Sequence, residues 1–414
     1  MPPKSAKSRT AASTTRTDPR WIAMTLLLAA GLISTLWNYS SIPTSRSAES
    51  ATVSLSPTRM EKIGAEFARA FPVHSNFSWC THEGYTRNKD KRTRDLYTFE
   101  SPKGLLYVKV PKAASSTTAS VWHRISRNNG NCDFREEHHY GKHIGNHYGN
   151  RDKSASFLLG SIRDPASRAI SRVFFSQVSQ MKKESTDANV LEWLNTTDGQ
   201  VGAVSEGQGG FQLRYMSFDP LKPGVAWNPE APGEVNNTDL VHQQVQQIVQ
   251  GYDFFIVVER MDESLIVLQL LLGIDIGDLL TLDSKVQGMY TYIAKCFKGV
   301  KAHISPRVKE HLSSNTWYAQ NYGDYVLHAA ANASLDKTID ALGRTRVEET
   351  VEKFRRLKSL ANEKCASRAF YPCSKEGKKQ LEKAKESCYV YGKDFGCGYQ
   401  CIDEMLNSKA ESLA

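Results

Sequence analysis

The chain has 414 residues, of which 40% are hydrophobic and 23% are charged, and its formal net charge is +9. This composition excludes a wholly disordered chain and is sufficient for a sizeable core in one or two domains. The positive charge is uneven: residues 1–20 carry a net +4, residues 101–185 carry +8, and the remainder carries −3. A basic segment of this kind indicates either a bound anionic ligand or a solvated basic face.

The N-terminus combines a basic segment with an apolar one. The apolar stretch WIAMTLLLAAGLISTLW has no charged residue and a tryptophan at each end, which is typical of a membrane-spanning helix. Because basic residues precede it, we expect a cytoplasmic tail (1–20), a single transmembrane anchor (21–38) and a type II orientation with the rest of the chain in the lumen. The alternative is a cleaved signal peptide, although no A-x-A cleavage site follows closely.

The sequence beyond residue 38 is consistent with a lumenal location. Residues 39–70 begin with a stretch rich in Ser, Thr and Pro, and we expect them to form a flexible stalk. N-x-[ST] sequons at positions 38, 76, 195, 236 and 332 predict a glycoprotein. Eight cysteines predict up to four disulfides: Cys80, Cys132, Cys296, Cys365, Cys373, Cys388, Cys397 and Cys401. A zinc site in the C-terminal cluster is the alternative, but no C-x-x-C pair supports it.

Short apolar runs alternate with helical patterns from residue 105 onward. We expect strands at 105–110, 156–162 and 253–259, and helices at 117–127, 166–180 and 263–273, the last of them ending near Gly273. Strands that alternate with helices predict an α/β fold with a central, mostly parallel sheet flanked by helices. We divide the lumenal part into a main domain (71–345) and a helical, Cys-rich C-terminal extension (346–414).

The stretch YVKVPKAASSTTAS (107–120) predicts a strand, a tight loop and the start of a helix. Such a loop presents backbone N–H groups and the positive end of the helix dipole, which together bind anions. Lys112 lies at its tip. The ATPase pattern G-x-x-x-x-G-K-[ST] is absent, because the loop has no glycine and its lysine precedes the small residues. A nucleotide kinase is therefore a poor fit, and a helix start with an incidental lysine is the structural alternative.

Three stretches, in this order, resemble the membrane-bound Golgi sulfotransferases that use 3′-phosphoadenosine 5′-phosphosulfate (PAPS), in particular the heparan sulfate and uronyl 2-O-sulfotransferases. KVPKAASST (109–117) is similar to their 5′-phosphosulfate loop, and IRDPASRAISRVFF (162–175) to their 3′-phosphate motif. YDFFIVVERMDESLIVLQLLLG (252–273) is a weaker downstream match. The resemblance covers residues 104–345. It implies a P-loop-like sulfotransferase fold, with 71–345 as the catalytic domain.

The resemblance assigns the cofactor-binding residues one by one. Lys112 would contact the oxygen that bridges sulfate and 5′-phosphate. The 5′-phosphate would be held by Ala113, Ala114, Ser115, Ser116 and Thr117. Arg163 and Ser171 would hold the 3′-phosphate, for which a planar guanidinium is well suited. Asp164 is expected to cap the next helix instead, with Pro165 at the first helical position.

Four histidines lie between the two motifs, in EEHHYGKHIGNHY (136–148). The resemblance implies that a histidine upstream of the RDP arginine deprotonates the acceptor hydroxyl, and His139 and His143 match its position best. Histidine suits this role because its unperturbed pKa is near neutrality. His138 and His147 remain alternatives or ordinary loop residues. The expected transfer requires no metal, so no metal-binding residue is assigned.

Together these assignments predict that the protein transfers the sulfuryl group of PAPS to a hydroxyl of a glycan or glycoprotein in the Golgi lumen. We expect attachment to the membrane through residues 21–38 and no nucleic-acid partner. Sulfation of tyrosine or lipid hydroxyls is one alternative, and an inactive lumenal protein that binds polyanions is another. Residues with both a functional and a structural interpretation are Arg168, Arg172, Gln212, Arg214, Glu259, Arg260 and Lys285.

Overall fold

The computed structural model of the protein describes residues 56–74, 103–129, 134–137, 145–195, 210–218, 237–282, 289–290, 296–369, 373–374, 376–378 and 398–413. In chain order its elements are α2 (Pro57–Phe67), β1 (Gly104–Val108), α3 (Ser115–Asn128), β2 (Phe134–Glu137), η1 (Gly145–Tyr148), β3 (Ser156–Ile162), α4 (Pro165–Val173), η2 (Phe174–Gln180), α5 (Asp187–Asn195), α6 (Phe211–Met216), α7 (Asn237–Gly251), β4 (Phe254–Val257), η3 (Val258–Arg260), α8 (Met261–Leu272), η4 (Ile276–Leu279), β5 (Met289–Tyr290), β6 (Cys296–Phe297), α9 (Pro306–Leu312), α10 (Asn315–Gln320), α11 (Tyr322–Leu342), α12 (Arg344–Cys365), η6 (Ala366–Arg368) and α14 (Tyr399–Leu413). No helix within these ranges is long and apolar enough to cross a membrane, and the anchor expected at 21–38 lies outside them.

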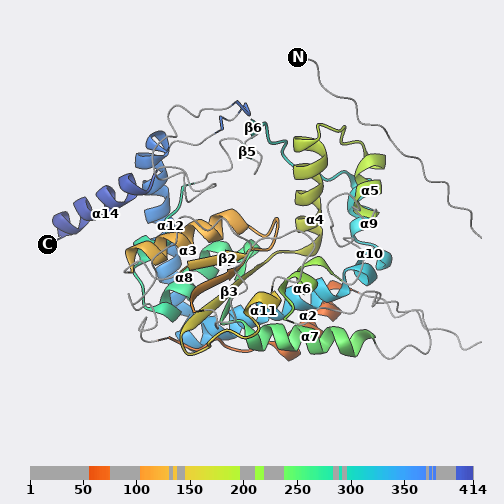
Figure 1. Cartoon of the computed structure of the whole chain (residues 1–414), viewed down its shortest axis with the longest axis horizontal. Coiled ribbons are helices and arrows are strands. Elements are labelled where there is room, and N and C mark those ends of the chain that lie inside the picture. Colours follow the sequence, from red (N-terminus) through yellow and green to blue (C-terminus); the bar gives the residue numbers. More distant parts are fainter. Residues whose placement is uncertain are drawn as a thin grey trace, which may run out of the picture. The chain divides into compact units, whose positions relative to one another are not determined.

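Four parallel strands form the central sheet, in the order β2-β1-β3-β4 (Figure 1). Every residue of β1, β3 and β4 is buried, as expected for a parallel sheet that helices cover on both faces. The predicted α/β fold is confirmed, and these three strands overlap the predicted ones. Because the strands run in the same direction, the segments that follow β1 and β3 leave the sheet at one edge. These two segments carry Lys112 and Arg163.

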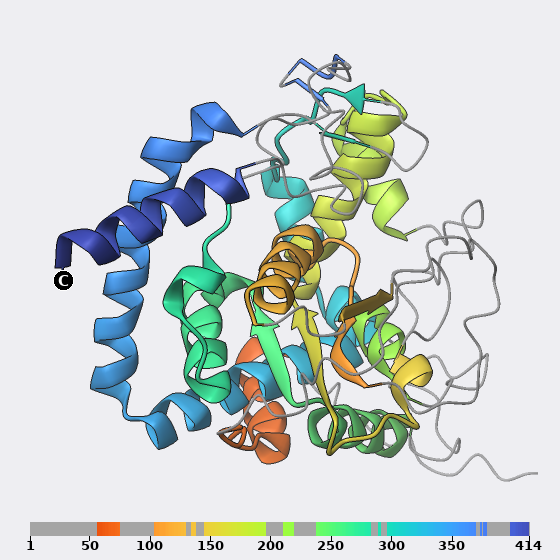
Figure 2. The same cartoon turned by 60° about the vertical axis from the view of Figure 1, so that its left-hand side comes forward.

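Helices flank the sheet and enclose one large apolar core. α3 contacts β1 and β2, α8 contacts β4, and α11 runs beside β4 with α2 and α7 packed on it (Figure 2). Trp122 of α3 and Phe157 of β3 are fully buried where helix and sheet meet. At the C-terminal end of α8, Gly273 adopts a φ of 65° and donates its N–H to the Gln269 carbonyl, which ends the helix as predicted.

Residues 57–67 form α2, whereas 39–70 was predicted to be a flexible stalk. Ser56 caps the helix by accepting the N–H of Arg59, and the Met60 side chain is buried. The helix packs so closely on α11 that an ideal Cβ on Gly64 would lie 2.5 Å from the Cβ of Ala329. The stalk prediction is therefore wrong over this segment, because one face of the helix belongs to the core.

A smaller apolar cluster lies beside the main core and is built by α4, η2, α5, α9 and α10. Trp317 is fully buried in it, and its indole N–H donates to the Tyr325 hydroxyl of α11 at 3.1 Å. Phe174 packs edge-on against His303. The predicted helix at 166–180 is here an α-helix, α4, that continues as a π-helix, η2. The cluster packs against α4, which lies within the second predicted motif.

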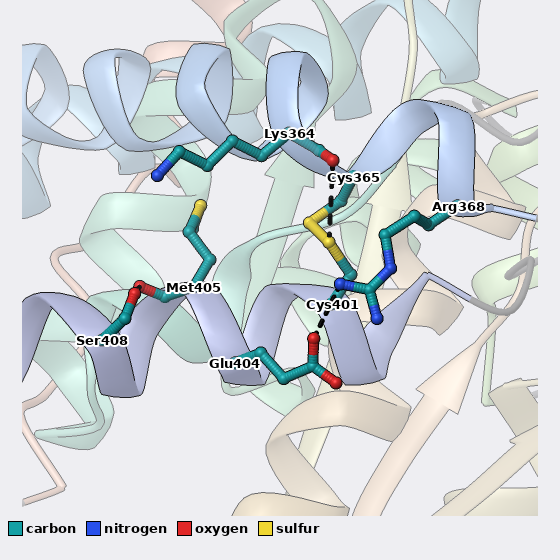
Figure 3. Close-up of a disulfide and its surroundings, with 7 residues drawn as sticks. All are labelled: Lys364, Cys365, Arg368, Cys401, Glu404, Met405 and Ser408. Carbon is teal, nitrogen blue, oxygen red and sulfur yellow. Dashed lines mark hydrogen bonds and ion pairs between the residues drawn. A yellow bond between two sulfur atoms is a disulfide. The ribbon is translucent and has the colours of Figure 1, made fainter.

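Two disulfides are formed in the described part of the chain. Cys365 of α12 is joined to Cys401 of α14 (Figure 3), and Cys296 of β6 is joined to Cys373. The disulfide prediction is confirmed for these four cysteines, whose sulfurs are thereby unsuited to bind zinc as thiolates. The other four cysteines lie outside the described residues. Within the residues that are described, no cluster of three or more His, Cys, Asp or Glu side chains could hold a metal.

The C-terminal extension packs onto the domain. α12 contacts α8, and α14 contacts α12. Asp403 of α14 forms ion pairs with both Arg124 and Arg127 of α3, each at 2.7 Å. The Tyr399 hydroxyl donates to the carbonyl of Ser120 at 3.2 Å. The last helix of the chain therefore supports α3, whose first turn follows the Lys112 loop.

Candidate functional site

The loop between β1 and α3 adopts an unusual backbone conformation. Lys112 has a φ of 67° and Ala114 a φ of 48°, so two residues without glycine's freedom lie in the left-handed region. Each such residue stores about 1 kcal/mol or more of strain, and strain of this kind is concentrated at functional sites. α3 begins at Ser115, and its N-cap residue, Ala114, gives it no side-chain hydrogen bond. The positive end of the helix dipole and the first-turn N–H groups are therefore directed toward this loop.

The loop between β3 and α4 is held by hydrogen bonds on both sides. Asp164 accepts the N–H of Ser167 at 2.7 Å and Pro165 follows it, so the predicted cap is confirmed. Gln212 of α6 is fully buried and forms two hydrogen bonds with the backbone of Arg163: its Oε1 accepts the N–H at 2.9 Å, and its Nε2 donates to the carbonyl at 2.7 Å. Gln212 thus positions Arg163, which favours its structural interpretation.

The two loops meet at Arg163 and Lys112. The Arg163 Nη1 donates to the Lys112 carbonyl at 3.1 Å. The Lys112 ammonium lies 4.0 Å from the centre of the Phe175 ring, within cation–π distance. Ser171 precedes Phe175 by about one helical turn, so the two side chains share a face of the α4–η2 helix. Two of the predicted residues, Lys112 and Arg163, are therefore in contact, and Ser171 lies on the helix that carries Phe175.

Arg163 retains an unused donor. Its Nε is buried and makes no hydrogen bond within the described part of the chain, and the nearest carboxylate oxygen, Glu259 Oε1, is 4.0 Å away. Burial lowers the pKa of the guanidinium, and the carboxylates of Glu259 and Asp164 partly offset that effect. An arginine keeps its positive charge at physiological pH even so. The arrangement can accept an anion that replaces the missing hydrogen bond.

The remaining predicted residues lie in the loop before α3, in the first turn of α3, in α4 or outside the described ranges. Ala113, Ser115 and Ser116 are buried, Ala114 is half-buried and Thr117 is exposed. Ser171 is half-buried. His139 and His143 lie outside the described residues, as does Lys285. Of the four histidines, His147 is described, and it lies in η1.

Arg168 and Arg260, which had both a functional and a structural interpretation, contact other side chains of the fold. Arg168 is buried, and its guanidinium lies 4.2 Å from the centre of the Phe211 ring, so it is not a solvated helix charge. Arg260 pairs with Glu263 at 2.6 Å and with Asp336 at 2.9 Å. Arg260 therefore does not form the ion pair with its neighbour Glu259 that was one interpretation of this strand end.

Glu259 and His328 belong to the site, and His328 was missed from the sequence. Glu259 Oε1 accepts the N–H of Asp164 at 3.0 Å, and its Oε2 lies 3.2 Å from Nε2 of His328. Asn332, one turn further along α11, donates to the His328 carbonyl. The only available signal was the position of Glu259 at the end of a strand, because His328 lies in an unremarkable helical pattern 69 residues later.

No protein-family model, curated protein or solved structure matches this chain. A functional conclusion therefore depends on the chemistry of the site itself. That chemistry consists of a strained loop at an uncapped helix start, a lysine, and an arginine with a free buried donor, all at one edge of the sheet. Such a set of cationic and N–H groups can bind an anion.

Proposed function

We propose that the protein is a PAPS-dependent O-sulfotransferase that modifies a hydroxyl of a glycan. The observation that carries the proposal is the hydrogen bond between the Arg163 guanidinium and the Lys112 carbonyl. It joins two motifs that are 51 residues apart, at the carboxyl ends of the neighbouring strands β1 and β3. A donor with phosphate groups at both its 3′ and 5′ positions needs two adjacent anion sites, and each motif supplies one.

The groups around this contact suit such a donor. The uncapped first turn of α3 would give its amide hydrogen bonds to the 5′-phosphate, beside the ammonium of Lys112. Arg163 would give the hydrogen bond of its buried Nε to the 3′-phosphate, together with the hydroxyl of Ser171. The parallel sheet is compatible with the P-loop-like sulfotransferase fold that we propose for the catalytic domain.

In the proposed transfer, the acceptor oxygen forms a bond to sulfur while the bond from sulfur to the bridging oxygen of the 5′-phosphate breaks. Lys112 stabilises the negative charge that develops on that oxygen. The acceptor proton passes to His139 or His143, in the segment that follows β2. Because β2 pairs with β1 in parallel, Glu137 at the end of β2 lies beside Val108, at the edge of the sheet from which the Lys112 loop leaves. The transfer requires no metal ion.

The acceptor and the location are part of the same proposal. A type II Golgi membrane protein anchored by residues 21–38 would meet glycans and glycoproteins in the lumen, and the two disulfides fit an oxidising compartment. Tyrosine or lipid hydroxyls are the alternative acceptors. An inactive protein that binds polyanions is the alternative from another class, and the strained Lys112 loop argues against it because simple charge attraction needs no strain.

The first experiment is calorimetric titration of the full-length protein with the product nucleotide, 3′-phosphoadenosine 5′-phosphate (PAP), without magnesium. We expect Arg163→Ala to weaken binding by about 10- to 150-fold, since a hydrogen bond to a charged group is worth about 1.5–3 kcal/mol. Lys112→Ala should weaken it by about tenfold. Lys103→Ala and Arg355→Ala remove exposed cations elsewhere and serve as matched controls that leave binding unchanged.

ATP in place of PAP should give no heat. If PAP fails to bind while heparin binds, the enzyme proposal is wrong and the polyanion-binding alternative is supported. If PAP binds, acceptor screening follows with His139→Ala and His143→Ala. The variant that lacks the base should lose sulfate transfer while it still binds PAP.

A further inference from the structure

Glu259 connects the Arg163 loop to helix α11. One of its oxygens accepts the N–H of Asp164 at the start of α4, and the same oxygen lies 4.0 Å from the Nε of Arg163. The other oxygen lies 3.2 Å from Nε2 of His328. The carboxylate is thus shared between an arginine that the proposed function assigns to a phosphate and a histidine that the proposed reaction does not use.

A carboxylate at this position opposes the binding of an anion. It attracts the Arg163 guanidinium and repels a phosphate that approaches the same group. Its separation of 4.0 Å is too long for a hydrogen bond, so the Nε of Arg163 remains free for the ligand. How strongly Glu259 repels a phosphate depends on how much of its negative charge is neutralised, and that depends on its second partner, His328.

His328 is the group that can change this balance. Its side chain is 18% exposed, and its Nε2 also lies 3.3 Å from the Nδ2 of Asn332. A protonated His328 would form an ion pair with Glu259 and reduce its pull on Arg163. A neutral His328 would leave the full carboxylate charge beside the phosphate site. Histidine is the side chain that ordinarily gains or loses its charge between pH 5 and 8.

Neighbouring carboxylates already have other partners. Asp324 of α11 accepts the N–H groups of Gln212 and Leu213, and Asp164 accepts that of Ser167. The charged groups on α2, β3–α4, α6, α7, η3, α8 and α11 are Arg59, Glu61, Lys62, Glu66, Arg163, Asp164, Arg168, Arg172, Arg214, Asp239, Glu259, Arg260, Asp262, Glu263, Asp324, Asp336, Lys337 and Asp340. Glu259 is the carboxylate that contacts His328 in the described part of the chain.

We infer that Glu259 and His328 are positioning residues that make phosphate binding at Arg163 tighten as the pH falls. This inference rests on the proposed function, because it takes the Arg163 ligand to be a phosphate of the donor nucleotide. Linkage requires the converse as well: a bound phosphate favours the protonated form of His328. The site is therefore tuned to hold its donor more tightly in mildly acidic surroundings.

The test is PAP titration of the full-length protein and three variants at about pH 5.5 and about pH 8, on either side of histidine's ordinary pKa. The Kd ratio between the two pH values contains a contribution from PAP's own protonation, which every variant shares. Relative to His328→Gln, we expect the wild type to gain about fivefold in affinity at the lower pH. Glu259→Gln should show the same pH dependence as His328→Gln but bind more tightly than it at both pH values, because it removes the competing charge. His242→Gln on α7, which removes a half-buried histidine that contacts Tyr322, should behave as the wild type does.

The titration of PAP itself does not confuse the result. Phosphate groups lose their second proton near pH 6, and this contribution is common to every variant. The inference is overturned if His328→Gln keeps the pH dependence of the wild type, or if Glu259→Gln weakens PAP binding at the higher pH. Absence of PAP binding by the wild type at both pH values overturns the proposed function and this inference together, so the two failures are distinguishable.

Discussion

Replacing Asp403 by asparagine should destabilise the protein, because it removes the charge that neutralises a buried arginine. The Arg124 side chain is 1% exposed, and its Nε donates to the Gly277 carbonyl at 3.0 Å. Its Nη1 is buried and has no hydrogen-bond partner among the described residues. Asp403 Oδ1, at 2.7 Å from Nη2, is therefore the acceptor that carries the opposite charge.

Breaking a fully buried ion pair from one side costs about 3–5 kcal/mol. Asp403 is 37% exposed, so water can partly replace its carboxylate, and we expect a loss of about 2 kcal/mol in the free energy of unfolding. For a unit of this size, that loss corresponds to a decrease of about 3 °C in Tm. Differential scanning calorimetry of the full-length protein can measure it.

The neighbouring residue provides a matched control. Glu404 also forms an ion pair at 2.7 Å, with Arg368, but both side chains are about half exposed (Figure 3). Glu404→Gln should therefore leave Tm unchanged. The double variant Arg124→Met/Asp403→Leu should recover most of the lost stability, because an apolar pair needs no counter-charge. Equal Tm values for Asp403→Asn and Glu404→Gln would refute the reasoning.

Three further predictions concern single positions. Gly64→Ala should destabilise the protein by about 2 kcal/mol in urea denaturation, because the new methyl group meets Ala329. Glu61→Ala, on the exposed face of the same helix, should leave the stability unchanged, and equal effects of the two substitutions would contradict the close packing. Ala114→Gly should change stability by less than about 1 kcal/mol, whereas Ala114→Val should cost about 2 kcal/mol, because a β-branched residue resists a positive φ; the reverse order would contradict the left-handed conformation. Burial alone raises the pKa of Glu259, but its hydrogen bonds outweigh that effect and lower it, so its stabilising contribution is present above its ordinary pKa and is lost as the pH falls through the lower folded value. Glu259→Gln should thus lose less stability than the wild type in denaturation series from about pH 6 to about pH 3.

Local patterns were sufficient to predict three of the four strands and the two loops, whereas β2 was not predicted. Continuous apolar runs identified β1, β3 and β4, because each strand is buried on both faces. The Asp-Pro pair identified the cap of α4. α2 was missed because its Ser- and Thr-rich flank suggested a stalk, although Met60, Ile63, Gly64 and Phe67 already followed the helical period.

The support of the site could not be predicted in the same way. Gln212 holds the backbone of Arg163 across 49 residues, and His328 reaches Glu259 across 69. Such pairs are set by the packing of α6 and α11 against the sheet and leave no periodic signal. The strain in the Lys112 loop could not be predicted either. Only the structure shows that Lys112 and Ala114 adopt positive φ values, which glycine usually adopts.

The support of α3 by the last helix has a consequence for the order in which the protein folds during synthesis. Arg124 and Asp403 are 279 residues apart, so α3 leaves the ribosome long before its charged partner exists. Until α14 has emerged, the Arg124 guanidinium and the part of α3 that α14 will cover remain exposed to chaperones and to other nascent chains. A fragment that ends at residue 345, the boundary predicted from the sequence, would lack Asp403 permanently, so a failure of that fragment to fold would say nothing about the candidate site residues.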